Sequence, residues 1–214
     1  DFGFINIKDR IPIYISASGP KVAQLAGRIA DGLILFGAVH PSIVKWMIGH
    51  MREGAEAAGR NPDDVYVLSM TAFYLTESDE QIETPEVREA VGPMVASSSN
   101  IFALSCHKEP NALPEDFRDE LMDFVGVYRE PDAPVETRHL KLYSGYLQHL
   151  KAEHEALMTK RIIQATTLTG TKQQVLGMIE AMRDAGIHQV AIQPIRATRE
   201  VVDQVASQIM PSFA

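Results

Sequence analysis

Residues 11–34 read IPIYISASGPKVAQLAGRIADGLI, and this stretch decides the fold. Its first part, Ile11–Ser16, is almost entirely apolar, which is typical of a strand covered on both faces by helices in a parallel sheet. Pro20 suits the first turn of a helix capped by Ser18-Gly19, and apolar residues then recur with helical spacing. A second apolar run, Gly32–Gly37, follows this helix. The stretch therefore predicts a strand, a crossover helix and a parallel strand.

The rest of the chain continues this alternation of strands and helices. We expect further strands at 65–75 and 189–193 and helices at 41–58, 173–185 and 198–210. The segment 77–167 is less regular and reads as a helical insertion, with helices at 84–104, 115–128 and 139–157 joined by Pro-rich turns. Four parallel strands alternating with helices predict an α/β fold.

Two architectures fit four such units: an open doubly wound domain and half of a TIM barrel. Hydrophobic periodicity does not choose between them. A dinucleotide-binding fold would carry a G-x-G-x-x-G fingerprint after its first strand, whereas Ser16–Pro20 reads SASGP with a single glycine. A Walker phosphate loop is also absent from the sequence.

Composition and charge limit the class of protein and its partners. With 214 residues, 45% hydrophobic and 22% charged, the chain has the balance of a globular protein. Its net charge of -8 repels nucleic acids and anionic membranes, so we expect neither as a partner. The longest apolar runs fall short of the ~20 residues that span a bilayer. Cys106 is the single cysteine, which predicts a reducing compartment, the cytoplasm.

A resemblance extends these predictions. Ile11–Ile34 resembles the fifth strand, phosphate-binding loop, helix and sixth strand of the bacterial luciferase-like oxidoreductases, which include the methylenetetrahydromethanopterin reductases. The stretch from Ile162 to Ile192 resembles the segment that enters the seventh helix and eighth strand of the same family. The resemblance implies that residues 1–214 form the C-terminal half of a TIM (β/α)8 barrel, strands five to eight, of a flavin or deazaflavin oxidoreductase or monooxygenase.

The same resemblance implies that a part of the barrel is missing. The chain begins at Asp1 rather than Met, and we expect that it is a piece of a longer protein or that a segment was removed. In the family the first four units supply much of the ring pocket and many proton-handling residues. We therefore expect the chain alone to be catalytically incomplete, and no catalytic residue is assigned.

The predicted cofactor site is the loop Ser16, Ala17, Ser18, Gly19 and Pro20. Here the carboxyl end of a strand meets a helix N-terminus, where backbone N–H groups and the helix dipole favour an anion. The alternative is a plain capped turn, which opens many α/β helices. The resemblance implies that this loop holds the phosphate of FMN or of the deazaflavin coenzyme F420.

The predicted pocket for a small-molecule substrate contains Phe36, Gly37, Val39 and His40, which follow the second strand, and Arg196, which follows the last. Sites of TIM barrels lie at this end of the strands. For His40 the alternative is a solvent-facing loop residue, and for Arg196 a surface salt bridge. In the sugar-phosphate dehydrogenases of the family a lysine stands at the place of Val39. This difference favours an apolar or neutral substrate.

Other polar residues carry weaker expectations. His139, Tyr143 and Tyr146 could roof the substrate pocket, although core packing is the commoner role of such residues. His149 and His154 are five residues apart, which is wrong for a pair on one helical face, so we predict no metal site.

Half a barrel would leave strand edges and an apolar face exposed, so we expect association with the missing half or with a second copy. The rival functions are a non-catalytic half barrel that binds only an anion, and an anion-binding open α/β module.

Overall fold

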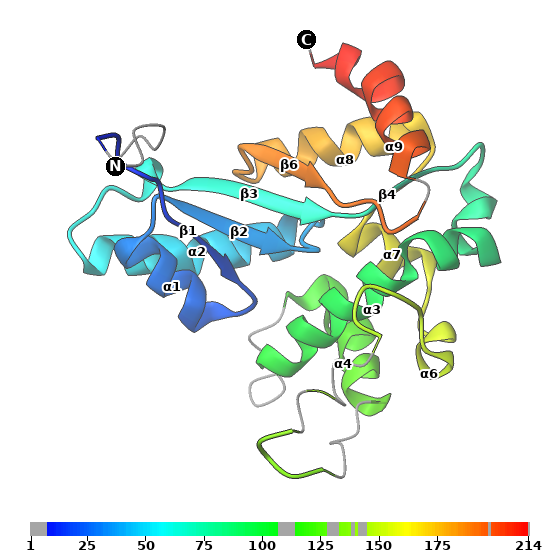
Figure 1. The fold of residues 1–214 in the computed structure, drawn as a ribbon, viewed down its shortest axis with the longest axis horizontal. Coiled ribbons are helices and arrows are strands. Elements are labelled where there is room, and N and C mark those ends of the chain that lie inside the picture. The colour runs from blue at the N-terminus through cyan, green and yellow to red at the C-terminus, as the bar shows by residue number, and fades with distance from the viewer. Residues whose placement is uncertain are drawn as a thin grey trace, which may run out of the picture.

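The computed structural model describes residues 8–106, 114–127, 133–137, 140, 145–196 and 198–213. Its central sheet has four parallel strands in the order β1-β2-β3-β6, which confirms the α/β fold (Figure 1). A second, smaller sheet pairs β4 with β5, also in parallel. The strands are β1 (Tyr14–Ala17), β2 (Gly32–Phe36), β3 (Tyr66–Thr71), β4 (Phe73–Leu75), β5 (Leu168–Gly170) and β6 (Gln189–Ile192).

The helices largely follow the predicted ranges. They are α1 (Pro20–Ile29), α2 (Pro41–Ala57), α3 (Pro85–Cys106), α4 (Arg118–Val127), α6 (Ala152–Glu155), α7 (Lys160–Thr166), α8 (Lys172–Asp184) and α9 (Thr198–Gln204). Short 3-10 turns precede β3, α3 and α4, and a π-helical turn, Val205–Ile209, continues α9. Within the described parts of the chain, no helix is both long enough and apolar enough to cross a membrane.

The predicted strand 65–75 is interrupted at Ala72. Its first part, β3, lies between β2 and β6, whereas its second part, β4, pairs with β5. The Ala72 carbonyl leaves the central sheet and accepts a hydrogen bond from the Leu168 amide at 3.0 Å. The Thr71 hydroxyl donates to the Thr166 carbonyl at 2.8 Å, which ties the same point to α7. The sequence analysis did not predict β5.

The predicted helix 139–157 is wrong as one continuous helix, because the structure interrupts it at residues 145–151. Residues 145–151 form a turn that precedes the short helix α6. Gly145 and Leu147 have φ angles of 77° and 56°, in the left-handed region, and this conformation ends a right-handed helix. We call residues 145–151 the crossing turn.

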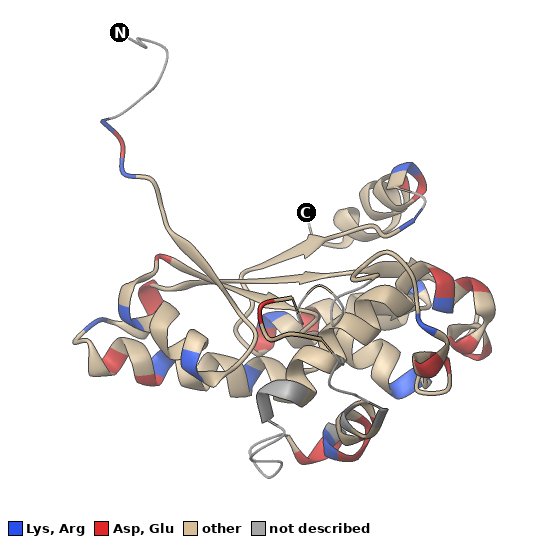
Figure 2. Ribbon diagram, turned by 60° about the horizontal axis from the view of Figure 1, so that its bottom comes forward, with Lys and Arg blue, Asp and Glu red and all other residues tan. Residues whose placement is uncertain are grey.

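The two faces of the central sheet differ in what covers them. Leu33, Leu35 and Val67 point to one face and are at most 2% exposed, because α1 and α2 pack on that face (Figure 2). Tyr14 and Tyr66 lie in register on the other face and are 40% and 37% exposed. Their rings touch edge to face, with centroids 6.2 Å apart. We call this second face the open face.

The prediction that helices cover both faces of the first strand is therefore wrong. Ile11 and Ile13 are 80% and 59% exposed, and the strand itself begins only at Tyr14. The chain before β1 extends outward, as Figure 2 shows, although Ile13 still exchanges hydrogen bonds with Asp31. The apolar run still ends at the predicted position, where β1 leads into α1.

Helix α1 approaches α2 through small residues. Ala23, Ala26 and Gly27 are its buried positions, and a Cβ on Gly27 would lie 1.9 Å from the Met51 carbonyl oxygen of α2. This close approach holds the N-terminus of α1 at the end of β1. The large apolar residues that predicted the helix lie elsewhere on it and stay 40–60% exposed: Val22, Leu25 and Ile29.

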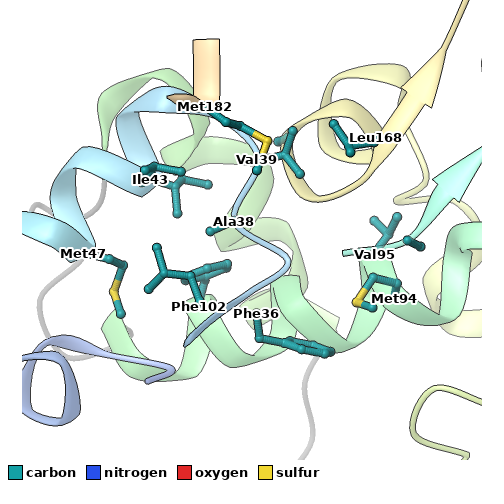
Figure 3. Packing of buried hydrophobic residues seen from close by; sticks show 14 of the residues in the cluster. Phe36, Ala38, Val39, Ile43, Met47, Met94, Val95, Phe102, Leu168 and Met182 are labelled. Atoms are coloured by element: carbon teal, nitrogen blue, oxygen red, sulfur yellow. The ribbon is translucent and has the colours of Figure 1, made fainter. Parts of the chain in front are cut away.

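A single hydrophobic core joins the sheet to the helices α3, α4 and α7. Ala38 and Val39 are buried just after β2, and Figure 3 shows them among Ile43 of α2, Met182 of α8 and Phe102 of α3. The chain that leaves β2 is therefore enclosed on several sides. Its backbone position is set by the core rather than by solvent.

Candidate functional site

The loop Ser16–Pro20 lies where the sequence predicts it. Ser16 and Ala17 end β1, Gly19 is the N-cap of α1, and Pro20 is its first residue. Gly19 is fully extended, with φ of -171°, and its carbonyl accepts a hydrogen bond from the Ala23 amide. As the N-cap residue, Gly19 has no side chain that could bond the first-turn amides. The amides of its first turn can therefore bind an anion.

Ser16 and Ala17 point to opposite faces of the sheet. Ala17 is 2% exposed on the helix-covered face, whereas Ser16 is exposed. Ser16 pairs with Ile34 in the register of β1 and β2, so it shares the open face with Phe36, two residues further along β2. The serine hydroxyl and the uncapped end of α1 thus meet at the carboxyl edge of the open face.

Phe36 contacts the crossing turn at the carboxyl edge of the open face. The Phe36 and Tyr146 rings are stacked, with centroids 6.1 Å apart and an angle of 23° between their planes. Gly37, the next residue, has a φ of 60°, and a Cβ there would lie 2.3 Å from the Ser98 Cβ of α3. Both the backbone angle and the close approach of α3 require glycine at this position.

Val39 and His40 turn away from Phe36, as Figure 3 shows for Val39. Their amides both donate to the Ala165 carbonyl of α7, at 3.1 and 3.0 Å. Val39 and His40 line a cavity of about 600 Å³, which we call the α7 cavity. Its small or apolar lining comes from the turn after β2, from Ala165 of α7 and from α8, and its other polar members are Asp116, Arg161 and Gln164.

His40 is half-buried at the N-terminus of α2, where its Nδ1 accepts a hydrogen bond from the Ser42 amide at 3.3 Å. Burial lowers the pKa of His40, the nearby Asp116 carboxylate raises it, and the Arg161 guanidinium lowers it further. The net direction is down, so His40 is neutral near pH 7. Because Nδ1 is an acceptor, the proton lies on Nε2, which can donate to a ligand but cannot accept a proton from it.

The charged residues of the α7 cavity are held by their neighbours. The Ser42 hydroxyl donates to Asp116 at 2.9 Å, and the Arg161 guanidinium lies 3.4 Å from Glu120. Asp116 is thus satisfied by a neutral hydroxyl and Arg161 by a carboxylate, so neither side chain requires an ion of opposite charge from a ligand.

Arg196 lies apart from Val39 and His40. Its Nη2 donates to the Gln148 carbonyl of the crossing turn at 3.0 Å, and its Nε is 3.9 Å from Glu89 of α3. The crossing turn therefore contacts the carboxyl end of β2 through Tyr146 and the residues after β6 through Gln148. Arg196 lines a separate cavity of about 340 Å³ between α3 and this turn.

The predicted substrate residues thus lie in three places. Phe36 and Gly37 lie under the crossing turn, Val39 and His40 line the α7 cavity, and Arg196 lines the cavity beside α3. Tyr146 stacks on one predicted site residue, Phe36. His139 and Tyr143 fall outside the described residues.

Sequence reasoning missed the polar residues that complete these cavities. Asp116, Arg161 and Gln164 are 75 residues or more from His40 along the chain, and no motif links them. Arg88 in the cavity beside α3 was missed for the same reason. Among the described side chains, no group of three His, Cys, Asp or Glu residues is placed to hold a metal ion.

Comparison with known proteins gives matches along most of the chain. The chain is 25% identical over 206 residues to the 5,10-methylenetetrahydromethanopterin reductase of Methanopyrus kandleri, an alignment that covers 95% of this chain and 51% of the reductase. It is 57% identical over 75 residues to the F420-dependent glucose-6-phosphate dehydrogenase of Mycolicibacterium gilvum, covering 34% of this chain and 22% of the dehydrogenase. The chain thus spans about half the length of the reductase and matches a shorter part of the dehydrogenase.

Solved structures show the same fold. The coenzyme F420 dependent tetrahydromethanopterin reductase from Methanopyrus kandleri superposes with a TM-score of 0.57 and 22% identity, covering 95% of this chain and 51% of that one. An F420-dependent secondary alcohol dehydrogenase in complex with an F420-acetone adduct gives 0.54 and 20%, covering 95% and 49%. The family model described as luciferase-like monooxygenase matches residues 4–189. The chain belongs to the luciferase-like monooxygenase family.

Proposed function

We propose that the chain is the C-terminal half of a (β/α)8 barrel oxidoreductase that binds a deazaflavin or flavin coenzyme by its phosphate at the loop Ser16–Pro20. The observation that carries the proposal is the uncapped N-terminus of α1 beside the exposed Ser16, in a chain of this family. One relative is an F420-dependent glucose-6-phosphate dehydrogenase, and the superposed reductase structure is described as coenzyme F420 dependent. These likenesses favour F420 over FMN.

Three features support the half barrel. The chain aligns along 95% of its length with only 51% of the reductase. The open face keeps Tyr14 and Tyr66 exposed, as the inner face of an incomplete barrel would. Helix α1 also exposes its large apolar residues, which the helix of a preceding unit would cover. In this proposal β1, β2, β3 and β6 are strands five to eight.

The residues at the carboxyl edge fit a phosphate and an attached ring. The amides of the first turn of α1 and the Ser16 and Ser18 hydroxyls are the donors that a phosphate needs. Gly19 carries no side chain to fill the space in front of them. The stacked pair of Phe36 and Tyr146 offers an aromatic surface on the same face for the ring. When bound, the coenzyme supplies the hydride or electron transfer, and these residues bind and orient it.

The α7 cavity beside Val39 and His40 is the proposed place of the substrate. Its small and apolar lining residues, and charged side chains that already have partners, favour an apolar or neutral molecule. His40 would orient such a substrate by donating from Nε2. It would not act as a base there, because its Nδ1 is already an acceptor for the Ser42 amide.

Coenzyme titration tests this proposal. The purified protein is titrated separately with F420 and with FMN, and binding is followed by the fluorescence of each coenzyme. Gly19→Asp places negative charge and bulk at the phosphate position, and we expect it to weaken binding at least about a hundredfold, close to the loss of two charge-assisted hydrogen bonds.

Gly49→Asp is the matched control, because a side chain at Gly49 on α2 meets nothing within 4 Å. It should leave coenzyme binding unchanged. If Gly19→Asp binds either coenzyme as tightly as the unchanged protein does, the phosphate does not lie at this loop and the proposal is wrong.

A further inference from the structure

A cavity of about 340 Å³ lies between α3 and the crossing turn, with two arginines in its lining. We call it the arginine cavity. Arg88 comes from the first turns of α3, and Arg196 comes from the segment after β6. The cavity shares no lining residue with the α7 cavity. The inference below therefore does not depend on the proposed coenzyme or substrate.

Arg88 is half-buried, and its Nε is buried without a hydrogen-bond partner among the described residues. Buried donors of this kind are rare, because losing hydration without a replacement partner costs stability. Nor does any described carboxylate form an ion pair with Arg88. A guanidinium presents its donors in one plane and accepts a carboxylate in a bidentate pair. Arg88 therefore has no acceptor for this donor among the described residues and can take one from a ligand.

Arg196 is also largely uncommitted. Of its donors, Nη2 bonds the Gln148 carbonyl, which fixes the side chain over the cavity. Its contact with Glu89 is long, at 3.9 Å, and the Glu89 side chain is 76% exposed. An ion pair of that kind in water contributes little. A better-placed carboxylate can displace it at small cost.

The other lining residues define the rest of the ligand. Pro85 and Leu150 provide an apolar wall. Glu89 and Glu155 are exposed acids in the lining, and they disfavour a ligand with more than one negative charge. The volume is at the low end of the range for small-molecule sites. The cavity therefore favours a small ligand with one negative charge and an apolar part.

We propose that the arginine cavity binds a small organic monocarboxylate, whose carboxylate lies between Arg88 and Arg196 and whose apolar part lies on Leu150 and Pro85. Inorganic phosphate offers the same oxygen acceptors with more charge and no apolar part. The glutamates and the apolar wall therefore make it the weaker ligand.

Calorimetric titration with butyrate, and separately with inorganic phosphate, tests the proposal. We expect saturable butyrate binding in the millimolar range or tighter, with phosphate weaker. Arg88→Ala and Arg196→Ala should each weaken butyrate binding about tenfold or more, the loss of one charge-assisted pair. Glu89→Gln should strengthen it by removing a competing acid. Arg183→Ala removes an exposed arginine paired with Asp184 away from the cavity, and should change nothing.

Arg196→Ala keeps the proposal testable if Arg88→Ala does not fold, because Arg196 lies in an exposed segment. The proposal is overturned if butyrate does not bind saturably, or if binding is the same in the two arginine variants as in Arg183→Ala. Tighter binding of phosphate than of butyrate would overturn the assignment of a monocarboxylate.

Discussion

The Tyr146 ring stacks on Phe36 at a centroid distance of 6.1 Å, which places the crossing turn over the end of β2. Two residues further along the chain, the same turn reaches the residues after β6, where Gln148 accepts a hydrogen bond from Arg196. The turn therefore spans the carboxyl edge of the open face. In a luciferase-like chain this is the edge at which we propose the coenzyme ring lies.

The stacked pair gives a first prediction. Tyr146→Leu removes the aromatic surface and should weaken coenzyme binding about threefold to tenfold, as expected for one aromatic contact of roughly 1 kcal/mol. Tyr146→Phe keeps the ring and serves as the control. Fluorescence titration measures both. Equal affinities of the leucine and phenylalanine variants would show that the ring of the coenzyme does not lie on this pair.

Gly37 gives a prediction about stability. Gly37→Ala should lower the free energy of unfolding by at least about 2 kcal/mol, because alanine is strained at a φ of 60° and its Cβ would meet Ser98. Gly49→Ala, in the middle of α2 with open space around it, should raise stability by about 0.5–1 kcal/mol. Urea unfolding measures both. A small loss at Gly37 would mean that α3 does not pack on the turn after β2.

His154 predicts a dependence of stability on pH. It is 7% exposed, with its ring tilted against Phe124 and its Nε2 3.4 Å from the Asn100 amide. Burial lowers the pKa of His154 below its ordinary value of 6.5; Glu153 raises it and Lys151 lowers it by smaller amounts. The unfolded chain therefore binds a proton at a pH where the folded chain does not. The contribution is fully present above pH 6.5 and is lost as the pH falls below it.

Comparison with His154→Gln isolates this effect. The pKa of His40 is lowered in the same direction, but His40 contributes equally to both proteins. Between pH 7 and pH 5 the unchanged protein should lose more free energy of unfolding than His154→Gln does. Parallel curves over that range would show that His154 is not buried against α3 and α4 in solution.

The exposed apolar side of α1 predicts association. Ile29 is 60% exposed, and the proposed half barrel needs a cover on this side of the helix. Ile29→Lys should therefore reduce association with a second copy or with the completing half, measured by light scattering after gel filtration. Val202→Lys changes a residue that is 56% exposed on α9 and should have less effect. A monomeric unchanged protein that binds no other chain would contradict the prediction.

The order of strands and helices could be predicted from the sequence because local signals mark it. Pro20 and Pro41 begin α1 and α2 as their positions predict, and Thr171 caps α8 through a capping box with Gln174. The break at Ala72 could not be predicted, because it depends on where α7 and β5 offer partners nearly a hundred residues later. The helix predicted at 139–157 could have been ended from the sequence, because Gly145 is a residue that readily takes the left-handed φ of 77° found there.

The candidate site was predictable in part for the same reason. The loop Ser16–Pro20 is continuous in sequence, and its strand-to-helix geometry follows from local rules. The α7 cavity and the arginine cavity bring together side chains from distant segments, and neither spacing nor composition indicates which segments meet. The apolar spacing predicted α1 but not which of its residues pack: Val22, Leu25 and Ile29 stay exposed, because small residues let α1 approach α2 closely.

A crystal structure of the protein with F420 bound tests the central claim most directly. We predict that the coenzyme phosphate lies at the uncapped N-terminus of α1, with its oxygens roughly 3 Å from the first-turn amides and from the Ser16 or Ser18 hydroxyl. A phosphate held elsewhere, for example between Arg88 and Arg196, with the loop Ser16–Pro20 in contact only with solvent, would contradict it.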